Sequence, residues 1–211
     1  MSCSDHDCQP AETGGRYRRI LWVALGLNAT MFLVEIVASV IAGSISLRAD
    51  ALDFLGDAAN YAIALAVVGL ALNWRARAAL LKGSVMGMFG LWVAGSTIYS
   101  AVTATVPKAE VMGVIGLLAL GVNLGVAGLL YQYRGADSQA LSVWLCTRND
   151  CIANIAVILA GAGVWASATA WPDIAVAAII ACLGLSSAVR VIRQALLEMR
   201  VPGIARGVPA E

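Results

Sequence analysis

Charged residues are scarce in this sequence of 211 residues, of which 13% are charged and 60% hydrophobic. A soluble domain needs about a quarter of its residues charged to cover its surface. The composition therefore excludes a soluble globular domain and indicates that lipid surrounds most of the chain. A formal net charge of +1 provides no basic surface for nucleic acid, so we expect no nucleic-acid partner.

Cysteine is also scarce, and its distribution argues against a disulfide framework. Two of the five cysteines lie in the polar first fifteen residues, and Cys146, Cys151 and Cys182 lie in apolar segments. This pattern fits reduced thiols, and we expect Cys151 and Cys182 to serve packing. The polar start also lacks the apolar stretch of a secretory signal peptide.

Six apolar runs of about 20 residues are long enough to cross a bilayer. The sequence therefore predicts an all-α integral membrane protein, a bundle of six transmembrane helices. We assign residues 1–18 and 199–211 to tails and 19–198 to the transmembrane domain. The six predicted spans are 19–42, 48–72, 79–102, 110–133, 140–166 and 172–196.

The basic residues predict the orientation of the bundle. Only Arg48 and Lys108 fall on one predicted side. Because cytoplasmic loops carry an excess of Lys and Arg, we expect both termini to be cytoplasmic, in a plasma or inner membrane. The eleven basic residues on the other side are Arg16, Arg18, Arg19, Arg75, Arg77, Lys82, Arg134, Arg190, Arg193, Arg200 and Arg206.

The second predicted span contains acids that are costly in lipid. An Asp at the centre of a membrane helix costs about 2.5–3.5 kcal/mol on insertion scales. Asp53 and Asp57 are four residues apart, so their carboxylates face one direction, one turn from each other. Two such anions repel each other. A divalent cation held between them would remove both the repulsion and the burial cost.

The fifth predicted span offers a matching pair, Cys146 and Asp150, with the same spacing. If the two helices pack together, three carboxylates and one thiolate converge, which suits a tetrahedral ion such as Zn²⁺. Two structural alternatives remain open. Cys146 could be a small buried hydrophobe, and Asp150 could pair with Arg148, although about 200° around the helix separates them.

Polar residues at corresponding positions indicate a weak internal repeat of three plus three helices. The sequence separation between Asn28 and Asp53 is similar to that between Asn123 and Cys146. Asn60 and Asn154 each follow an acid by about one helical turn. Many transporters contain such repeats. We treat Asn60 and Asn154 as possible auxiliary groups of the site.

Two further acids lie in the first two predicted spans, outside this set of four. Glu35 lies within the first span and could carry protons or assist the site. Asp50 could also be auxiliary. Its position after Ser46 slightly favours a role at the helix start, where the helix dipole stabilises an anion.

The N-terminal segment Cys3-Ser4-Asp5-His6-Asp7-Cys8 combines two thiols, an imidazole and two carboxylates. Such tracts bind transition metals readily when unfolded. Cys3, His6 and Cys8 are therefore candidates for auxiliary metal capture, and a chance occurrence in a short tail is the alternative.

Two segments resemble the cation diffusion facilitator family. Residues 43–60, GSISLRADALDFLGDAAN, are similar to the family's helix 1–2 region, with its Gly-Ser, Ala-Asp-Ala-Leu and paired ligand positions. Residues 143–150, VWLCTRND, resemble the helix 5 motif, in which His usually precedes Asp by four residues. The resemblance covers roughly residues 19–198.

The resemblance implies a six-helix transporter that exports a divalent metal in exchange for protons, usually as a homodimer. The ligand roles carry over to Asp53, Asp57, Cys146 and Asp150. Cys146 replaces the usual His, which leaves the choice between ions such as Zn²⁺ and Cd²⁺ open. Because the chain stops at Glu211, we expect a short form without the family's C-terminal cytoplasmic domain.

We expect no enzymatic activity and no resident cofactor, since the metal would be cargo. A non-transporting membrane metal sensor or accessory subunit is the first alternative. A remote one is an intramembrane aspartyl protease, for which Asp57 and Asp150 would supply a dyad on two helices.

Overall fold

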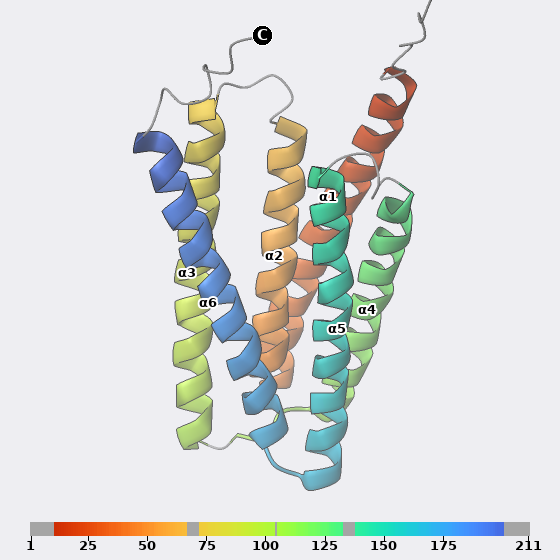
Figure 1. Cartoon of the computed structure of the whole chain (residues 1–211). Helices are drawn as coiled ribbons and strands as arrows, with labels where there is room; N and C mark the ends of the chain where they lie inside the picture. The colour runs from red at the N-terminus through yellow and green to blue at the C-terminus, as the bar shows by residue number, and fades with distance from the viewer. Residues whose placement is uncertain (1–10, 67–71, 104, 133–137, 201–211) are drawn as a thin grey trace, which may run out of the picture.

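The computed structural model describes residues 11–66, 72–103, 105–132 and 138–200 (Figure 1). These residues form six helices and no strand, which confirms the predicted all-α class. The helices match the six predicted spans in number and order, although α1 and α3 begin eight and seven residues before their spans. Their bounds are α1 Ala11–Ala42, α2 Ile45–Ala66, α3 Leu72–Thr103, α4 Ala109–Tyr131, α5 Ser138–Ser167 and α6 Trp171–Arg200.

Five of the helices are long and apolar enough to cross a membrane, and α2 is the exception. Its 22 residues extend about 33 Å, sufficient for a bilayer core of about 30 Å. Its composition fails because of Arg48 and its three aspartates. The five qualifying stretches are Gly15–Ala42, Ala79–Thr103, Ala109–Tyr131, Asp150–Ser167 and Trp171–Leu197.

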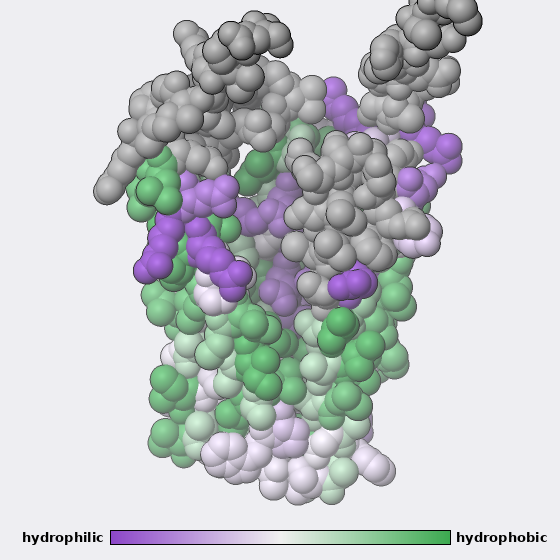
Figure 2. All heavy atoms as spheres, in the orientation of Figure 1, coloured by the Kyte–Doolittle hydropathy of each residue, from purple (hydrophilic) through white to green (hydrophobic). Residues whose placement is uncertain are grey.

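The position of α2 explains how it tolerates these charges. It lies in the middle of the bundle in Figure 1 and packs against α1, α3, α5 and α6. Large apolar side chains are exposed on each of the other five helices but, among the described residues, on none of α2. The outer helices thus supply the apolar surface for lipid, visible as the broad hydrophobic band of Figure 2, and they shield α2 from it.

The packing of the helices agrees with the predicted three-plus-three repeat. α1 packs on α2 as α4 packs on α5, and α2 contacts α3 as α5 contacts α6. Each helix also contacts its counterpart in the other half, most extensively α3 with α6. An interface between two related halves is where transporters commonly bind their cargo.

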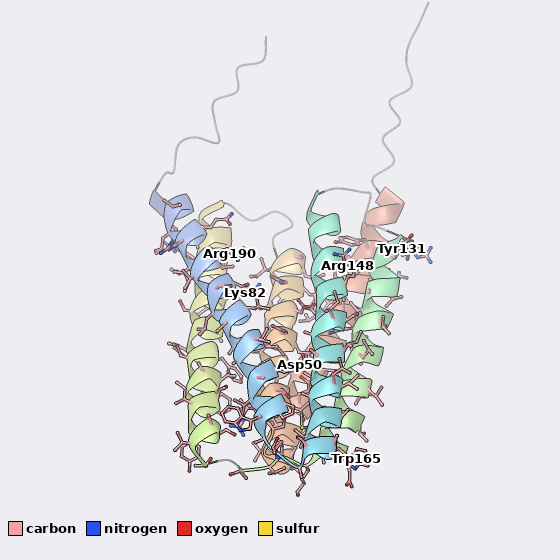
Figure 3. All side chains as sticks on the ribbon, turned by 60° about the horizontal axis from the view of Figure 1, so that its bottom comes forward. Asp50, Lys82, Tyr131, Arg148, Trp165 and Arg190 are labelled. Atoms are coloured by element: carbon pink, nitrogen blue, oxygen red, sulfur yellow. The ribbon has the colours of Figure 1, made fainter. Side chains whose placement is uncertain are left out.

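The two ends of the bundle differ in charge. We call the end where α1 begins and α6 finishes the terminal end, and the opposite end, with the α1–α2, α3–α4 and α5–α6 connections, the loop end. Lys82, Arg148 and Arg190 lie in the terminal half in Figure 3, whereas Arg48 and Lys108 belong to the loop end. The uneven distribution predicted from the sequence is therefore present among the described residues.

A tight turn joins α1 to α2. Gly43 adopts φ +68°, a left-handed conformation that glycine takes without penalty, and the Ser44 amide donates to the Ser39 carbonyl at 3.1 Å. α2 then starts at Ile45 with no acid in its first turn. The predicted role of Asp50 at the helix start is therefore wrong, because Asp50 lies five residues further along and is buried.

Candidate metal site

A cavity of about 480 Å³ lies between α2, α3, α5 and α6. Acidic and amide groups share its wall with one lysine and several apolar side chains. Figure 2 shows hydrophilic residues gathered in the terminal half of the molecule, some within a hollow, above a largely hydrophobic lower half. The lining residues are Asp53, Gly56, Asp57, Asn60, Lys82, Met86, Asp150, Ala153, Leu183, Gly184, Ser187 and Val191.

Three of the four predicted ligands line this cavity. Asp53 and Asp57 come from successive turns of α2, as their spacing predicted, and Asp150 reaches the cavity from α5. The carboxyl groups of Asp57 and Asp150, from the two helices, interact electrostatically with each other. Asp57 is only 8% exposed, so a cation held between the two carboxylates would offset both their burial and their repulsion.

The fourth predicted ligand, Cys146, belongs to α5 one turn before Asp150, and its side chain lies outside the described residues. Among the side chains that the structure does describe, no three His, Cys, Asp or Glu gather tightly enough to hold a metal ion. The ligand set therefore stays a prediction. The structure contributes the shared cavity and the close Asp57–Asp150 pair.

Lys82 is a residue of the cavity that sequence reasoning missed, since it served only as evidence for orientation. It projects from α3, and its ammonium group donates a hydrogen bond to the side-chain oxygen of Asn60. Its charge also acts on Asp57. The predicted auxiliary residue Asn60 thus holds a cation beside the acids, and that cation offsets part of their negative charge.

Glu35 and Asp50 form a second acidic pair, between α1 and α2. Glu35 is 0% exposed, and neither of its carboxyl oxygens accepts a hydrogen bond. Asp50 is 1% exposed, and its carboxyl group neighbours that of Glu35. The pair lies outside the cavity lining yet acts electrostatically on Asp53. Burial of two neighbouring acids, with Oδ2 of Asp50 also without a hydrogen-bond partner, is costly unless a proton or a cation offsets the charge.

The predicted polar repeat residues are buried as well. Asn154 follows Asp150 by one turn and is fully buried, and neither of its amide atoms has a hydrogen-bond partner. Asn28 and Asn123, the matched residues of α1 and α4, are both buried with a side-chain oxygen that accepts no bond. Unsatisfied polar groups in a core are costly, which is typical of functional positions.

The remaining predicted site residues, Cys3, His6 and Cys8, lie outside the described residues. Cys151 is buried, as expected for a packing role, and donates to the Thr147 carbonyl at 3.3 Å. Cys182 is exposed on α6, so its predicted role in packing within the bundle is wrong. Both thiols are free.

The arrangement provides a polar compartment inside a membrane bundle, with carboxylates from two helices facing each other. Such oxygen groups bind divalent cations, and movement of one helix against the other would change their separation.

Comparison with known proteins identifies the family. The "Metal cation efflux system protein CzcD" of Cupriavidus metallidurans is 27% identical over 180 residues, covering 79% of this chain and 56% of that protein. The "Cation efflux system protein CzcD" of an Alcaligenes species matches to the same extent. The chain thus spans about half the length of these curated relatives. The family profile described as "Cation efflux transmembrane domain" matches residues 21–199, so the chain belongs to the cation efflux family.

Proposed function

We propose that this chain exports a divalent metal cation, Zn²⁺ or Cd²⁺, in exchange for protons. The observation that carries the proposal is the convergence of Asp53, Asp57 and Asp150, from two helices, on one cavity within a cation efflux domain. Both curated relatives carry names that describe cation efflux.

The distribution of charge supports a direction for the path. The positive-inside rule places the terminal end in the cytoplasm, in a plasma or inner membrane. Lys82, Asn60 and Val191 line the cavity toward this end. Metal therefore enters the cavity from the cytoplasm and leaves through the loop end after the bundle rearranges.

Metal binding and proton movement share the same groups in this proposal. A dication between Asp57 and Asp150 replaces the proton that the pair otherwise needs, and Asp53 and the Cys146 thiolate complete a tetrahedral set. Because ligands must lose protons to bind, loading releases protons on the cytoplasmic side. Protons entering from the loop end then compete the metal off the carboxylates.

The second acidic pair fits an auxiliary role. Glu35 and Asp50 act on Asp53 electrostatically, so a dication bound at Asp53 favours the loss of their shared proton. Asn60 lies about one turn from Asp57 and holds Lys82 beside the acids, and the unpartnered amide of Asn154, one turn from Asp150, is available to a ligand. We further propose that the chain acts as a homodimer, as the family resemblance implies.

Two alternatives remain testable. The closeness of Asp57 and Asp150 is what an aspartyl protease dyad would require. A transporter accounts better for Asp53 and for the family match. A membrane metal sensor or accessory subunit would bind metal at the same cavity without moving it.

Zinc flux into sealed proteoliposomes with an imposed pH gradient tests the proposal. Asp57→Asn keeps the size of the side chain and removes its charge, so we expect uptake to fall at least tenfold while the protein still inserts. Glu110→Gln is the matched control, since Glu110 is an exposed acid in the first turn of α4. Wild-type flux in Asp57→Asn contradicts the site assignment. Zinc binding without flux by the unaltered chain supports the sensor, and peptide cleavage supports the protease.

A further inference from the structure

Asp173 lies in the first turn of α6, where an acid ordinarily interacts with its own helix. Its carboxylate instead turns to α2 and is 1% exposed. One oxygen accepts from the Ser44 hydroxyl at 2.7 Å and from the Ser46 amide at 3.0 Å. The other accepts from the Ile45 amide at 2.8 Å. Three donors from the start of α2 therefore converge on one residue of α6.

These bonds complete the N-terminus of α2. The first amides of a helix have no partner within it. Asp173 takes those of Ile45 and Ser46, and the Ser44 hydroxyl takes that of Leu47 at 3.2 Å. The buried carboxylate also faces the positive end of the α2 dipole. The start of α2 is therefore held by another helix as well as by its own capping serine.

A pocket of about 490 Å³, lined by residues that include Gly43, Ile45 and Arg48, opens beside this contact, and packed groups separate the contact from the cavity with the three aspartates. The Lys108 amide donates to the Ala42 carbonyl at 2.8 Å, which ties the α3–α4 connection to the end of α1. Ala49 of α2, Val93 of α3 and Ala177 of α6 are each fully buried in one apolar cluster. The cavity with the three aspartates lies further along α2, toward the terminal end.

We propose that Asp173 is a positioning residue that controls opening of the loop end. Its carboxylate holds α2 on α6 while the cavity is loaded, and its hydrogen bonds to α2 break when the loop end opens. We call this contact, between Asp173 and residues 44–46, the latch. The inference rests on the proposed function. Asp53 and Asp57 lie about 12 Å and 18 Å along the helix from Ile45. Movement of the start of α2 therefore redirects both carboxylates. At the loop end, water can replace the broken hydrogen bonds.

A reversible covalent lock tests whether the contact must open. Ser44→Cys and Asp173→Cys are combined and joined by a membrane-impermeant bis-methanethiosulfonate, in which each cysteine thiolate displaces a sulfinate and forms a reducible disulfide, so that a tether replaces the hydrogen bonds. We expect the tethered protein to bind Zn²⁺ as before, to lose at least tenfold in proteoliposome uptake, and to recover on reduction. Each single variant, treated identically, is the control. Undiminished uptake by the tethered protein means that α2 and α6 move as one body and overturns the proposal.

A second measurement needs no transport, so it separates failure of the latch from failure of the proposed function. Ala177→Cys places a thiol one turn from Asp173, at a buried position. A membrane-impermeant maleimide should label it from the loop end several-fold faster when Asp173→Asn is added, and at an intermediate rate with Ser44→Ala. Glu110→Gln, at an exposed acid of the same end, should leave the rate unchanged. Equal labelling with and without both latch substitutions overturns the proposal even if zinc transport is confirmed.

Discussion

Replacing Asp173 by alanine gives the prediction whose size follows most directly from the structure. The change removes the acceptor of the Ile45 and Ser46 amides and of the Ser44 hydroxyl. A buried donor that loses its partner costs about 1–3 kcal/mol. The two amides alone therefore give about 2–6 kcal/mol, and partial access of water at the end of the bundle reduces this to about 3 kcal/mol. Asp173→Asn keeps one acceptor oxygen, so we expect about half that loss.

The assay is equilibrium unfolding in mixed micelles, with Glu110→Ala as control. A surface substitution away from special contacts changes stability by about 0.5 kcal/mol or less, which sets the scale for the control. Hydrogen exchange provides a local measure, since the amides of Ile45 and Ser46 should exchange faster in Asp173→Ala. The exchange rate of the Leu47 amide should rise less, because the Ser44 hydroxyl remains its partner. Stability of Asp173→Ala within 0.5 kcal/mol of the unaltered chain would refute the assignment of this cap.

Three further predictions concern the cargo. Cys146→His should keep Zn²⁺ flux and lose relative preference for Cd²⁺, because imidazole is a harder ligand than thiolate. An unchanged Cd²⁺/Zn²⁺ flux ratio would make Cys146 a packing residue. Lys82→Met removes the cation that acts on Asp57 and would repel a bound Zn²⁺ ion. Relief of about 1 kcal/mol of this repulsion should make Zn²⁺ bind roughly three- to tenfold more tightly, as measured by calorimetry. Unchanged affinity would contradict this role of Lys82. Deleting residues 2–10 should raise the zinc concentration for half-maximal flux and leave maximal flux intact; unaltered kinetics would leave the tail without a role in capture.

The fold was largely predictable because lipid imposes simple demands. Runs of about 20 apolar residues specify helices in lipid, and each of the six predicted spans contains most of one helix, five of which are apolar enough to cross a membrane. The convergence of Asp53, Asp57 and Asp150 was also predictable, because fixed spacing within two helices places the acids on one face of each.

The errors and omissions involve contacts between distant segments. Asp50 was placed at a helix start from its local position, yet it is buried beside Glu35 of another helix. The group that completes the start of α2 is Asp173, 127 to 129 positions away, and no local pattern links it to Ser44. Lys82 counted only as one basic residue among many, and its contact with Asn60 depends on how α3 packs against α2.

Calorimetry of Zn²⁺ binding to the purified chain, repeated in buffers of different ionisation enthalpy, tests the central claim most directly, because it measures metal affinity and proton release together. We expect the unaltered chain to bind Zn²⁺ at the cavity and to release protons as it does so. We also expect that Asp57→Asn and Asp150→Asn each lose most of the affinity and of the proton release, while Glu110→Gln loses neither. Binding by Asp57→Asn with the affinity and proton release of the unaltered chain would contradict the claim that these carboxylates hold the metal.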